Sequence, residues 1–261
     1  MEKKVVLITG SSRGIGRETA KLLANDGFSV VLHGKNPQRL KETTQSFLQQ
    51  GLDVKSFAAD VTNIDEVTAL FEFILKEYGR LDVLVTNASL TMESNFMATD
   101  LPAFRSVVDS HIYGTVIPIK VMLDEITANK GSIILISSLA GIHGLPRFSA
   151  YCTGKMGLTA FWQSLRIEKR KSGLHLGLVH LAFVQNDPDK TLINAKGELE
   201  QMPPRPPGLQ QPQQIVAKGI YRAIKKRKNR TVLSIYGKVF AWIIRHFPTI
   251  VHIMLSRFFK I

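Results

Sequence analysis

Three side chains whose types and spacing suit proton transfer lie in the middle of the chain. Tyr151 and Lys155 are four positions apart in an expected helix, so both lie on one face of it. Ser138 ends the strand expected before that helix. A phenol keeps its proton up to about pH 10, and a neighbouring ammonium lowers the pKa of such a group. We therefore expect Tyr151 to act as general acid or base, Ser138 to orient the reacting oxygen and Lys155 to assist.

A glycine-rich turn near the N-terminus lies between an expected strand and an expected helix. It has the sequence Thr9-Gly10-Ser11-Ser12-Arg13-Gly14-Ile15-Gly16. Glycine permits a tight turn and lets a pyrophosphate approach the N-terminus of the helix. The pattern alone is weak, but its place at the start of a run of strand–helix units is the context that dinucleotide binding requires. The sequence therefore predicts a dinucleotide site here.

The residues after the second expected strand indicate which dinucleotide is bound. An enzyme that uses NAD places an acid here to bind the free ribose 2′-OH. The segment His33-Gly34-Lys35-Asn36 contains no acid, and Arg13 of the glycine-rich turn can reach the same region. Two cations without a carboxylate suit a 2′-phosphate, since each charge-assisted hydrogen bond contributes roughly 1.5–3 kcal/mol. We predict NADP(H) as the cofactor, with a solvated turn lysine as the alternative for Lys35.

Further cofactor contacts are expected where the third and fourth strands end. Asp60 follows the third strand, and its carboxylate either accepts a hydrogen bond from the adenine amino group or caps the next helix. Asn87 and Ala88 follow the fourth strand, where they leave room for a cofactor or merely form a strand-end turn. No metal site is expected. The complete predicted cofactor set is Gly10, Ser12, Arg13, Gly14, Ile15, Gly16, Lys35, Asp60, Val61, Asn87, Ala88, Tyr151 and Lys155.

Strand-like and helix-like segments alternate along the chain, and this order positions the residues above. Short runs rich in Val, Ile and Leu indicate buried parallel strands at 5–9, 28–33, 54–57, 83–86, 132–137, 175–181 and 231–235. Helices are expected near 15–26, 37–50, 64–78, 102–128, 151–171 and 212–227. The alternation predicts an α/β fold with a parallel sheet and helices on both faces. Ligands then bind at the carboxyl ends of the strands.

Residues 183–214 interrupt this alternation and are too long for a simple connection. The prolines at 203–208 exclude a long regular helix there. We interpret the segment as a substrate loop or lid, with a surface insertion that has no function as the alternative.

Taken together, these motifs resemble those of the short-chain dehydrogenase/reductase family. The resemblance rests on the glycine-rich turn, Asn87-Ala88, Ser138 and Tyr151-Cys152-Thr153-Gly154-Lys155, and it covers about residues 1–235. It implies a single doubly wound (Rossmann) domain with a seven-stranded sheet, a ribose contact for Lys155, and homodimers or homotetramers packed through two long central helices. Within the family the chain is similar to reductases labelled 3-oxoacyl-carrier-protein reductase-like, and to lipid- and steroid-handling members with apolar C-terminal extensions.

Three positions depart from the pattern of that family. His111 takes the place of an asparagine that holds a water near the lysine. A histidine can bond water and titrates near neutral pH, so His111 either preserves a proton relay or is a satisfied structural residue. Thr86-Asn87-Ala88-Ser89 replaces the usual Asn-Asn-Ala-Gly. Ala182-Phe183 replaces a Pro-Gly that contacts the nicotinamide, so Phe183 adds bulk there.

Two functions compete. The first is an NADP(H)-dependent oxidoreductase that transfers a hydride to or from an apolar carbonyl or alcohol substrate, with Ser138, Tyr151, Lys155 and His111 as the catalytic residues. The alternative is a non-catalytic NADP-binding sensor or scaffold on a membrane or partner, which the changes at His111 and 182–183 motivate.

Residues 236–261 form a tail that is both basic and apolar. Pro248 would kink a helix here or begin a second one. No stretch has the roughly 18 uncharged residues of a spanning helix. We weigh contact with a membrane interface against ordinary packing on the domain or on a twin subunit. One polar stripe of a helix would contain Lys238, Arg245, Thr249, His252, Ser256 and Lys260.

Charge and cysteine content limit the expected binding partners and cellular location. Of the 34 Lys and Arg residues, 12 lie after residue 200, where no Asp or Glu occurs. Such a block attracts anionic surfaces or is simply solvated. The basic run at 225–230 lacks interleaved aromatic residues, which disfavours nucleic acid as a partner. Cys152 is the only cysteine and the N-terminus does not resemble a signal peptide, so we expect a cytoplasmic protein with possible peripheral contact at the inner membrane face.

Overall fold

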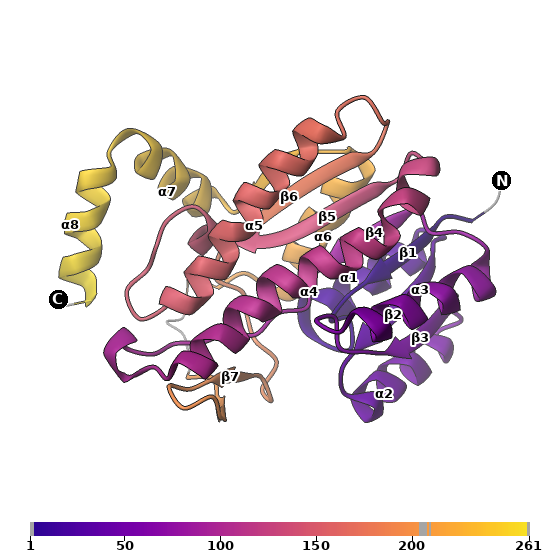
Figure 1. The fold of residues 1–261 in the computed structure, drawn as a ribbon, viewed down its shortest axis with the longest axis horizontal. Helices are drawn as coiled ribbons and strands as arrows, with labels where there is room; N and C mark the ends of the chain where they lie inside the picture. The colour runs from indigo at the N-terminus through magenta and orange to yellow at the C-terminus, as the bar shows by residue number, and fades with distance from the viewer. Residues whose placement is uncertain (1–2, 204–207, 209, 260–261) are drawn as a thin grey trace.

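The short apolar runs of the sequence pair into one parallel sheet, in which most strand residues are buried. The computed structural model describes residues 3–203, 208 and 210–259. Its main sheet has the strand order β3-β2-β1-β4-β5-β6-β9, with every neighbouring pair parallel (Figure 1). These strands are β1 Val5–Ile8, β2 Ser29–Gly34, β3 Val54–Ala58, β4 Val83–Thr86, β5 Ser132–Ser138, β6 His175–Leu181 and β9 Arg230–Leu233. The seven-stranded doubly wound fold predicted for a single α/β domain is confirmed.

Helices cover both faces of the sheet, and each face has its own apolar core. One core joins the sheet to α1, α2 and α6, through side chains such as Leu23 and Phe47. The other joins it to α3, α4 and α5, through Leu70, Met122 and Trp162. The helices of the domain are α1 Gly14–Asn25, α2 Pro37–Leu48, α3 Ile64–Tyr78, α4 Leu101–Ala128, α5 Ser149–Glu168 and α6 Gln213–Lys225, with short 3-10 helices η1 Phe96–Ala98 and η2 Leu139–Gly141.

The strand order reverses at β1. The chain proceeds outward from β1 to β2 and β3, then returns to place β4 on the other side of β1. In such sheets the reversal leaves a crevice outside the carboxyl ends of the strands. The glycine-rich turn follows β1 and Asn87 follows β4, so both are positioned at this crevice.

Two features of the C-terminal half differ from the sequence-based expectations. Strand β9 ends at Leu233 instead of 235, because the backbone of Ser234 has a φ of 152°. The hydroxyl of Ser234 accepts a hydrogen bond from the backbone N of Gly237 at 2.9 Å, and this bond caps the helix α7 Ile235–His246 that follows. The 183–214 segment contains an unpredicted antiparallel hairpin of β7 Thr191–Ile193 and β8 Leu199–Gln201. The expected absence of a helix at 203–208 concerns residues that lie mostly outside the described ranges.

The tail forms two helices at the end of the molecule away from the N-terminus (Figure 1). These are α7 Ile235–His246 and α8 Pro248–Phe259, so the prediction that Pro248 begins a second helix is confirmed. Among the described residues no single helix is long and apolar enough to cross a membrane, and only this pair passes that test jointly, with a bend of 119°. Helix α8 contacts the domain through His252, whose ring centroid lies 5.7 Å from that of His143, and it buries Val251, which is 1% exposed. Lys260 of the predicted polar stripe lies outside the described residues.

Candidate active site

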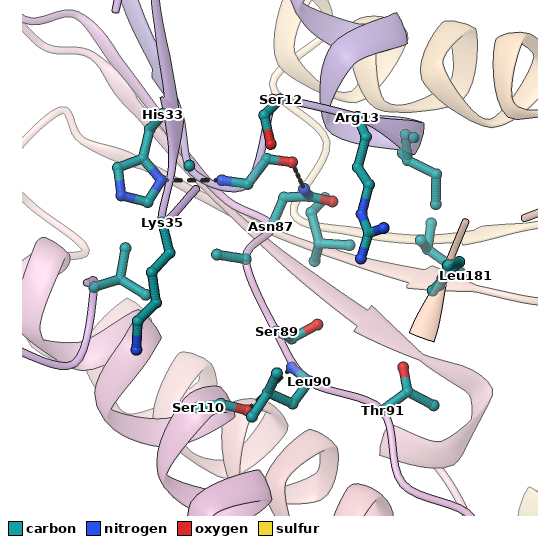
Figure 2. A pocket seen from close by; sticks show the side chains of 18 of the residues that line it. Ser12, Arg13, His33, Lys35, Asn87, Ser89, Leu90, Thr91, Ser110 and Leu181 are labelled. Carbon is teal, nitrogen blue, oxygen red and sulfur yellow. Dashed lines mark hydrogen bonds between the residues drawn. The ribbon is translucent and has the colours of Figure 1, made fainter. Parts of the chain in front are cut away.

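A cleft of about 660 Å³ opens at the carboxyl ends of the strands. Figure 2 shows Ser12, Arg13 and Lys35 around it, with Asn87 near the centre of the view. Of the predicted residues, the cleft is lined by Gly10, Ser12, Arg13, Gly14, Ile15, Lys35, Asp60, Val61, Asn87, Ala88, Ser138, Tyr151 and Lys155. The other two, Gly16 and His111, are buried behind this lining.

The glycine-rich turn has a backbone that requires glycine. Gly10 has a φ of +65° and Gly14 a φ of +61°, both in the left-handed region. A Cβ on Gly10 would lie 2.9 Å from the Cα of Ala88, and one on Gly16 would lie 2.8 Å from Nδ2 of Asn87. Within the described ranges no side chain caps the first turn of α1, so its backbone N–H groups remain available to an anion. The pyrophosphate of a nicotinamide dinucleotide fits this cradle.

Two side chains tie the turn to neighbouring strands. The amide nitrogen of Asn87 donates to the carbonyl oxygens of Thr9 and Gly10, both at 3.0 Å. Nδ1 of His33 accepts from the backbone N of Gly10 at 3.2 Å, and Nε2 lies 3.0 Å from the carbonyl oxygen of Ala59 (Figure 2). Burial, only partly offset by the bond to Ala59, lowers the pKa of His33 to about 4. The ring is therefore neutral at pH 7, with one nitrogen accepting and the other donating. We did not predict this role from the sequence.

The region expected to select the cofactor holds carboxylates as well as cations. Nζ of Lys35 lies 2.6 Å from Oδ2 of Asp60. Nη1 of Arg13 and Nη2 of Arg39 lie 3.3 Å and 2.8 Å from Oδ2 of Asp189. The expectation of two cations without a carboxylate therefore needs correction. Asp60 was expected among the cofactor contacts, but the sequence did not show that it pairs with Lys35, that Asp189 reaches this region or that Arg39 adds a third cation.

Asp60 lines the cleft but does not cap the next helix, which was one of its two expected roles. Its Oδ1 accepts from the backbone N of Thr62 at 3.0 Å, while Asn63 provides the N-cap of α3. Burial alone would raise the pKa of Asp60, but hydrogen bonds from Lys35 and Thr62 outweigh it and lower that pKa to about 2. The carboxylate is therefore ionised throughout the neutral range, and its adenine contact stays a prediction.

Ser138, Tyr151 and Lys155 line the same cleft as the glycine-rich turn. Ser138 is the last residue of β5, and its Oγ accepts from the backbone N of Ala140 at 3.2 Å. Tyr151 and Lys155 are one turn apart on α5, with Nζ of Lys155 5.7 Å from the centroid of the Tyr151 ring. Nζ also donates to the carbonyl oxygen of Ile136 at 3.0 Å. The structure thus brings together the three residues that the sequence selected for proton transfer.

Lys155 carries its amino group in a buried position, with only 4% of the residue exposed. Burial, followed by the positive charge of Lys190, lowers the pKa of Lys155 to about 7. Ammonium and amine forms are therefore both populated at neutral pH. Negative charge brought into the cleft would favour the ammonium form.

A histidine that we did not predict supports Ser138 from the neighbouring strand. Nε2 of His180 accepts from Nε of Arg230 at 3.2 Å, so Nδ1 carries the proton and donates to the carbonyl oxygen of Ser138 at 3.0 Å. Burial lowers the pKa of His180 to about 4, which keeps the ring neutral. The signal in the sequence was a histidine near the carboxyl end of β6, a strand that is apolar apart from its two histidines.

His111 packs edge-on against Tyr151, with the two ring centroids 5.0 Å apart. It is 1% exposed, and neither ring nitrogen has a hydrogen-bond partner among the described residues. Burial, followed by the charge of Lys155, lowers the pKa of His111 well below its usual value. This direction disagrees with the expected titration near neutral pH, and the alternative of a structural histidine stays a prediction. Its part in a proton relay stays a prediction.

The segment after β6 was expected to place the bulky side chain of Phe183 at the nicotinamide end of the site, and the structure differs. Ala182 lines the cleft, whereas Phe183 does not and is 45% exposed, so its bulk points elsewhere. Further along, Oδ1 of Asp187 accepts from Nε2 of Gln213 at 3.0 Å and lies 3.8 Å from Nη2 of Arg17. These contacts connect the segment to α1 and α6. The role of a substrate loop or lid stays a prediction.

Cys152, which follows Tyr151, is the only cysteine and is buried. Its Sγ accepts from the backbone N of Leu145 at 3.3 Å. Burial raises the pKa of the Cys152 thiol. Within the described part of the chain, no group of three or more His, Cys, Asp or Glu side chains is arranged to hold a metal ion.

Comparisons with known proteins agree with this arrangement. A 3-oxoacyl-[acyl-carrier-protein] reductase, FabG, of Chlamydia muridarum (strain MoPn / Nigg) is 33% identical over 199 residues, which cover 75% of this chain and 80% of the relative. A short chain dehydrogenase/reductase from Burkholderia phymatum in complex with NAD superposes with a TM-score of 0.80 at 19% identity, covering 94% of this chain and 93% of the other. An alcohol dehydrogenase from Thermococcus sibiricus complexed with 5-hydroxy-NADP gives 0.77 at 23% identity, covering 90% and 98%.

The two solved structures share the fold of this chain, and they hold different cofactors, NAD in one and 5-hydroxy-NADP in the other. The family model described as short chain dehydrogenase matches residues 4–196, which include the glycine-rich turn, Ser138, Tyr151 and Lys155. The resemblance first noted in the motifs is thus confirmed over most of the chain, and the protein belongs to the short-chain dehydrogenase/reductase family of oxidoreductases.

Proposed function

We propose that this protein is an NADP(H)-dependent reductase or dehydrogenase that acts on a carbonyl or hydroxyl carbon of an apolar substrate. The proposal rests on one observation: Ser138, Tyr151 and Lys155 line the same cleft as the glycine-rich turn. A bound nicotinamide would supply or accept the hydride. Apolar lining from Leu90 and Leu181 supports an apolar substrate.

Tyr151 transfers the proton. In the reducing direction its phenol donates a proton to the carbonyl oxygen of the substrate while that carbon receives a hydride. Ser138 accepts from the backbone N of Ala140, which leaves its hydroxyl proton to donate to the same substrate oxygen. Ser138 therefore orients the substrate and stabilises the charge that develops on its oxygen.

Lys155 assists without direct contact with the substrate. Its ammonium form lies near the Tyr151 ring and stabilises the phenolate that remains after proton transfer, because opposite charges favour each other's ionised forms. The hydrogen bond to Ile136 holds the amino group in place. In the oxidising direction the same ammonium keeps Tyr151 in the phenolate form, which accepts the proton of the substrate hydroxyl.

Preference for NADP(H) is supported by the cations beside the cleft. Arg13 and Arg39 share the carboxylate of Asp189, and Lys35 pairs with Asp60. Three cations against two carboxylates leave one net positive charge. A 2′-phosphate can take the place of the Asp189 carboxylate as the partner of both guanidinium groups, which a ribose 2′-OH cannot.

The test combines cofactor binding with turnover. Equilibrium dissociation constants for NADPH and NADH are measured first, and a panel of apolar and polar carbonyls is then followed at the nicotinamide absorbance. We expect tighter binding of NADPH and turnover of apolar carbonyls. Tyr151→Phe should lower kcat by at least about 100-fold, because it removes the proton donor, while the dissociation constant of NADPH stays near that of the wild type.

The matched control is Tyr113→Phe, which removes a phenol hydroxyl from an exposed position on α4 and should leave kcat unchanged. Activity retained by Tyr151→Phe would contradict the mechanism. Tight NADPH binding without turnover of any carbonyl by the wild type would instead favour the non-catalytic sensor.

A further inference from the structure

The outer surface of the tail presents apolar side chains that the described protein does not cover. On α7 the exposed residues are Ile235, Val239 and Trp242, of which Ile235 is 82% and Trp242 56% exposed. Their spacing of four and three places them on one face of the helix. Trp242 also lies against His246 and Phe247 at the bend, with ring centroids 4.8 Å and 5.9 Å away.

Helix α8 also exposes apolar side chains. Val251 is buried, whereas Ile250, Ile253 and Met254 are each about half exposed. Both tail helices therefore leave apolar side chains open to a partner. We name this feature the tail surface and define it by Ile235, Val239, Trp242, Phe247, Ile250, Ile253 and Met254.

The charged side chains around the tail surface are all positive. Lys238, Arg245 and Arg257 are exposed on the two helices, and the whole stretch after residue 200 contains no Asp or Glu. An apolar face bordered by cations and lacking acids is complementary to an anionic lipid headgroup layer above an acyl region. Trp242 and His246 at the bend add the ring types that suit such an interface.

A second copy of the chain suits this surface less well. A symmetric contact places the same patch on both sides, so Lys238 and Arg245 would face the same cations with no tail carboxylate to pair with them. Like charges facing one another across an interface oppose association.

The dimensions of the helices favour lying on a bilayer over crossing it. Each helix has 12 residues, or about 18 Å, whereas the hydrocarbon core is about 30 Å thick. The bend of 119° folds the pair back on itself. We propose that the tail surface docks the protein peripherally on an anionic lipid bilayer, with its apolar side chains in the interface and its cations among the headgroups.

The tail itself contacts a segment that lies between two of the proposed catalytic residues. A Cβ on Gly237 of α7 would lie 3.4 Å from Leu139 of η2, and His252 of α8 contacts His143. Both partners belong to residues 139–148, which connect Ser138 to the helix of Tyr151. A tail docked on lipid would therefore lie against the connection between Ser138 and the helix of Tyr151.

The experiment is flotation of the full-length protein with vesicles of phosphatidylcholine alone or mixed with anionic phosphatidylglycerol, at low and high salt. We expect binding to the anionic vesicles that weakens with salt. Lys238→Glu and Arg245→Glu should each weaken it by about fivefold or more, and Trp242→Glu should also weaken it. The controls are Lys41→Glu, which makes the same charge reversal as Lys238→Glu, and Leu48→Glu, which likewise replaces an exposed apolar residue by an acid; both lie on α2 and should bind as the wild type.

Folding of every variant is checked by circular dichroism, so that loss of binding is not confused with loss of structure. Failure of the wild type to float with anionic vesicles at low salt would overturn the proposal, as would equal losses in the α2 controls. Self-association in analytical ultracentrifugation that Trp242→Glu abolishes, without vesicle binding by the wild type, would assign the tail surface to a second copy instead. None of these readouts depends on turnover.

Discussion

At the scale of single residues, the site combines groups that the sequence could place with groups that it could not. Tyr151 and Lys155 were predictable because a separation of four residues on one helix fixes their shared face. His33 and His180 were not, because each joins strands whose pairing is set by the whole sheet. Asp189 reaches Arg13 across 176 positions, a distance at which sequence spacing carries no information.

Lys190→Gln tests the electrostatics of Lys155. The charge of Lys190 lowers the pKa of Lys155, so removing it should raise that pKa above about 7. The ammonium form, which is present below its pKa, then persists to higher pH. We expect the alkaline limb of the kcat/KM profile to move upward by a fraction of a pH unit, because this profile reports groups of the free enzyme. Lys196→Gln, at an exposed position between β7 and β8, is the control, and identical profiles for both variants would contradict the argument.

At the scale of elements, the strands and helices of the domain were predictable because each buries one continuous apolar pattern. The β7–β8 hairpin was not, since its strands have three residues each and β8 is exposed. The stretch between β6 and α6 meets both α1 and α2 through Asp187 and Asp189. It therefore links helix α1, which follows the glycine-rich turn, to helix α2, which follows the strand expected to select the cofactor.

Asp189→Asn tests this connection. The Asp189 carboxylate competes with a 2′-phosphate for Arg13 and Arg39, so its removal should strengthen NADPH binding while NADH binding changes little. Because these ion pairs are partly exposed, the gain should be at most about fivefold. Dissociation constants for both cofactors provide the measurement, with Glu198→Gln in the same segment as the control. Weaker binding of NADPH would show that Asp189 organises the arginines and does not compete for them.

At the scale of the whole molecule, folding holds several histidines neutral inside the protein. Burial lowers the pKa of His33, His175 and His180 to about 4, against about 6.5 in the unfolded chain. Between these values the unfolded state binds protons that the native state does not. The free energy of unfolding must therefore fall as the pH decreases from about 6.5 to about 4. Individual histidines were visible in the sequence, but their neutral state depends on the packing around them.

His175→Gln isolates one of these contributions away from the cleft. His175 lies at the start of β6, with Nδ1 3.2 Å from Oγ of Ser132. The variant should show a shallower loss of unfolding free energy with acid, by roughly 1 kcal/mol per pH unit near pH 5. Urea unfolding at pH 7, 6 and 5 measures this slope. Parallel slopes for wild type and variant would mean that His175 takes up its proton in the native state.

The thiol of Cys152, which is buried and accepts a hydrogen bond from the backbone N of Leu145, can report how often this part of the protein opens. Because Cys152 is 4% exposed, a thiol reagent reaches its sulfur only when the structure around it opens. With reagent in excess, the modification rate counts these openings, as amide exchange does for backbone protection. A ligand that keeps the surroundings of Cys152 closed lowers the modification rate, and a ligand that favours their open form raises that rate. A labelling time course with and without a ligand thus shows whether that ligand stabilises the segment that precedes Tyr151.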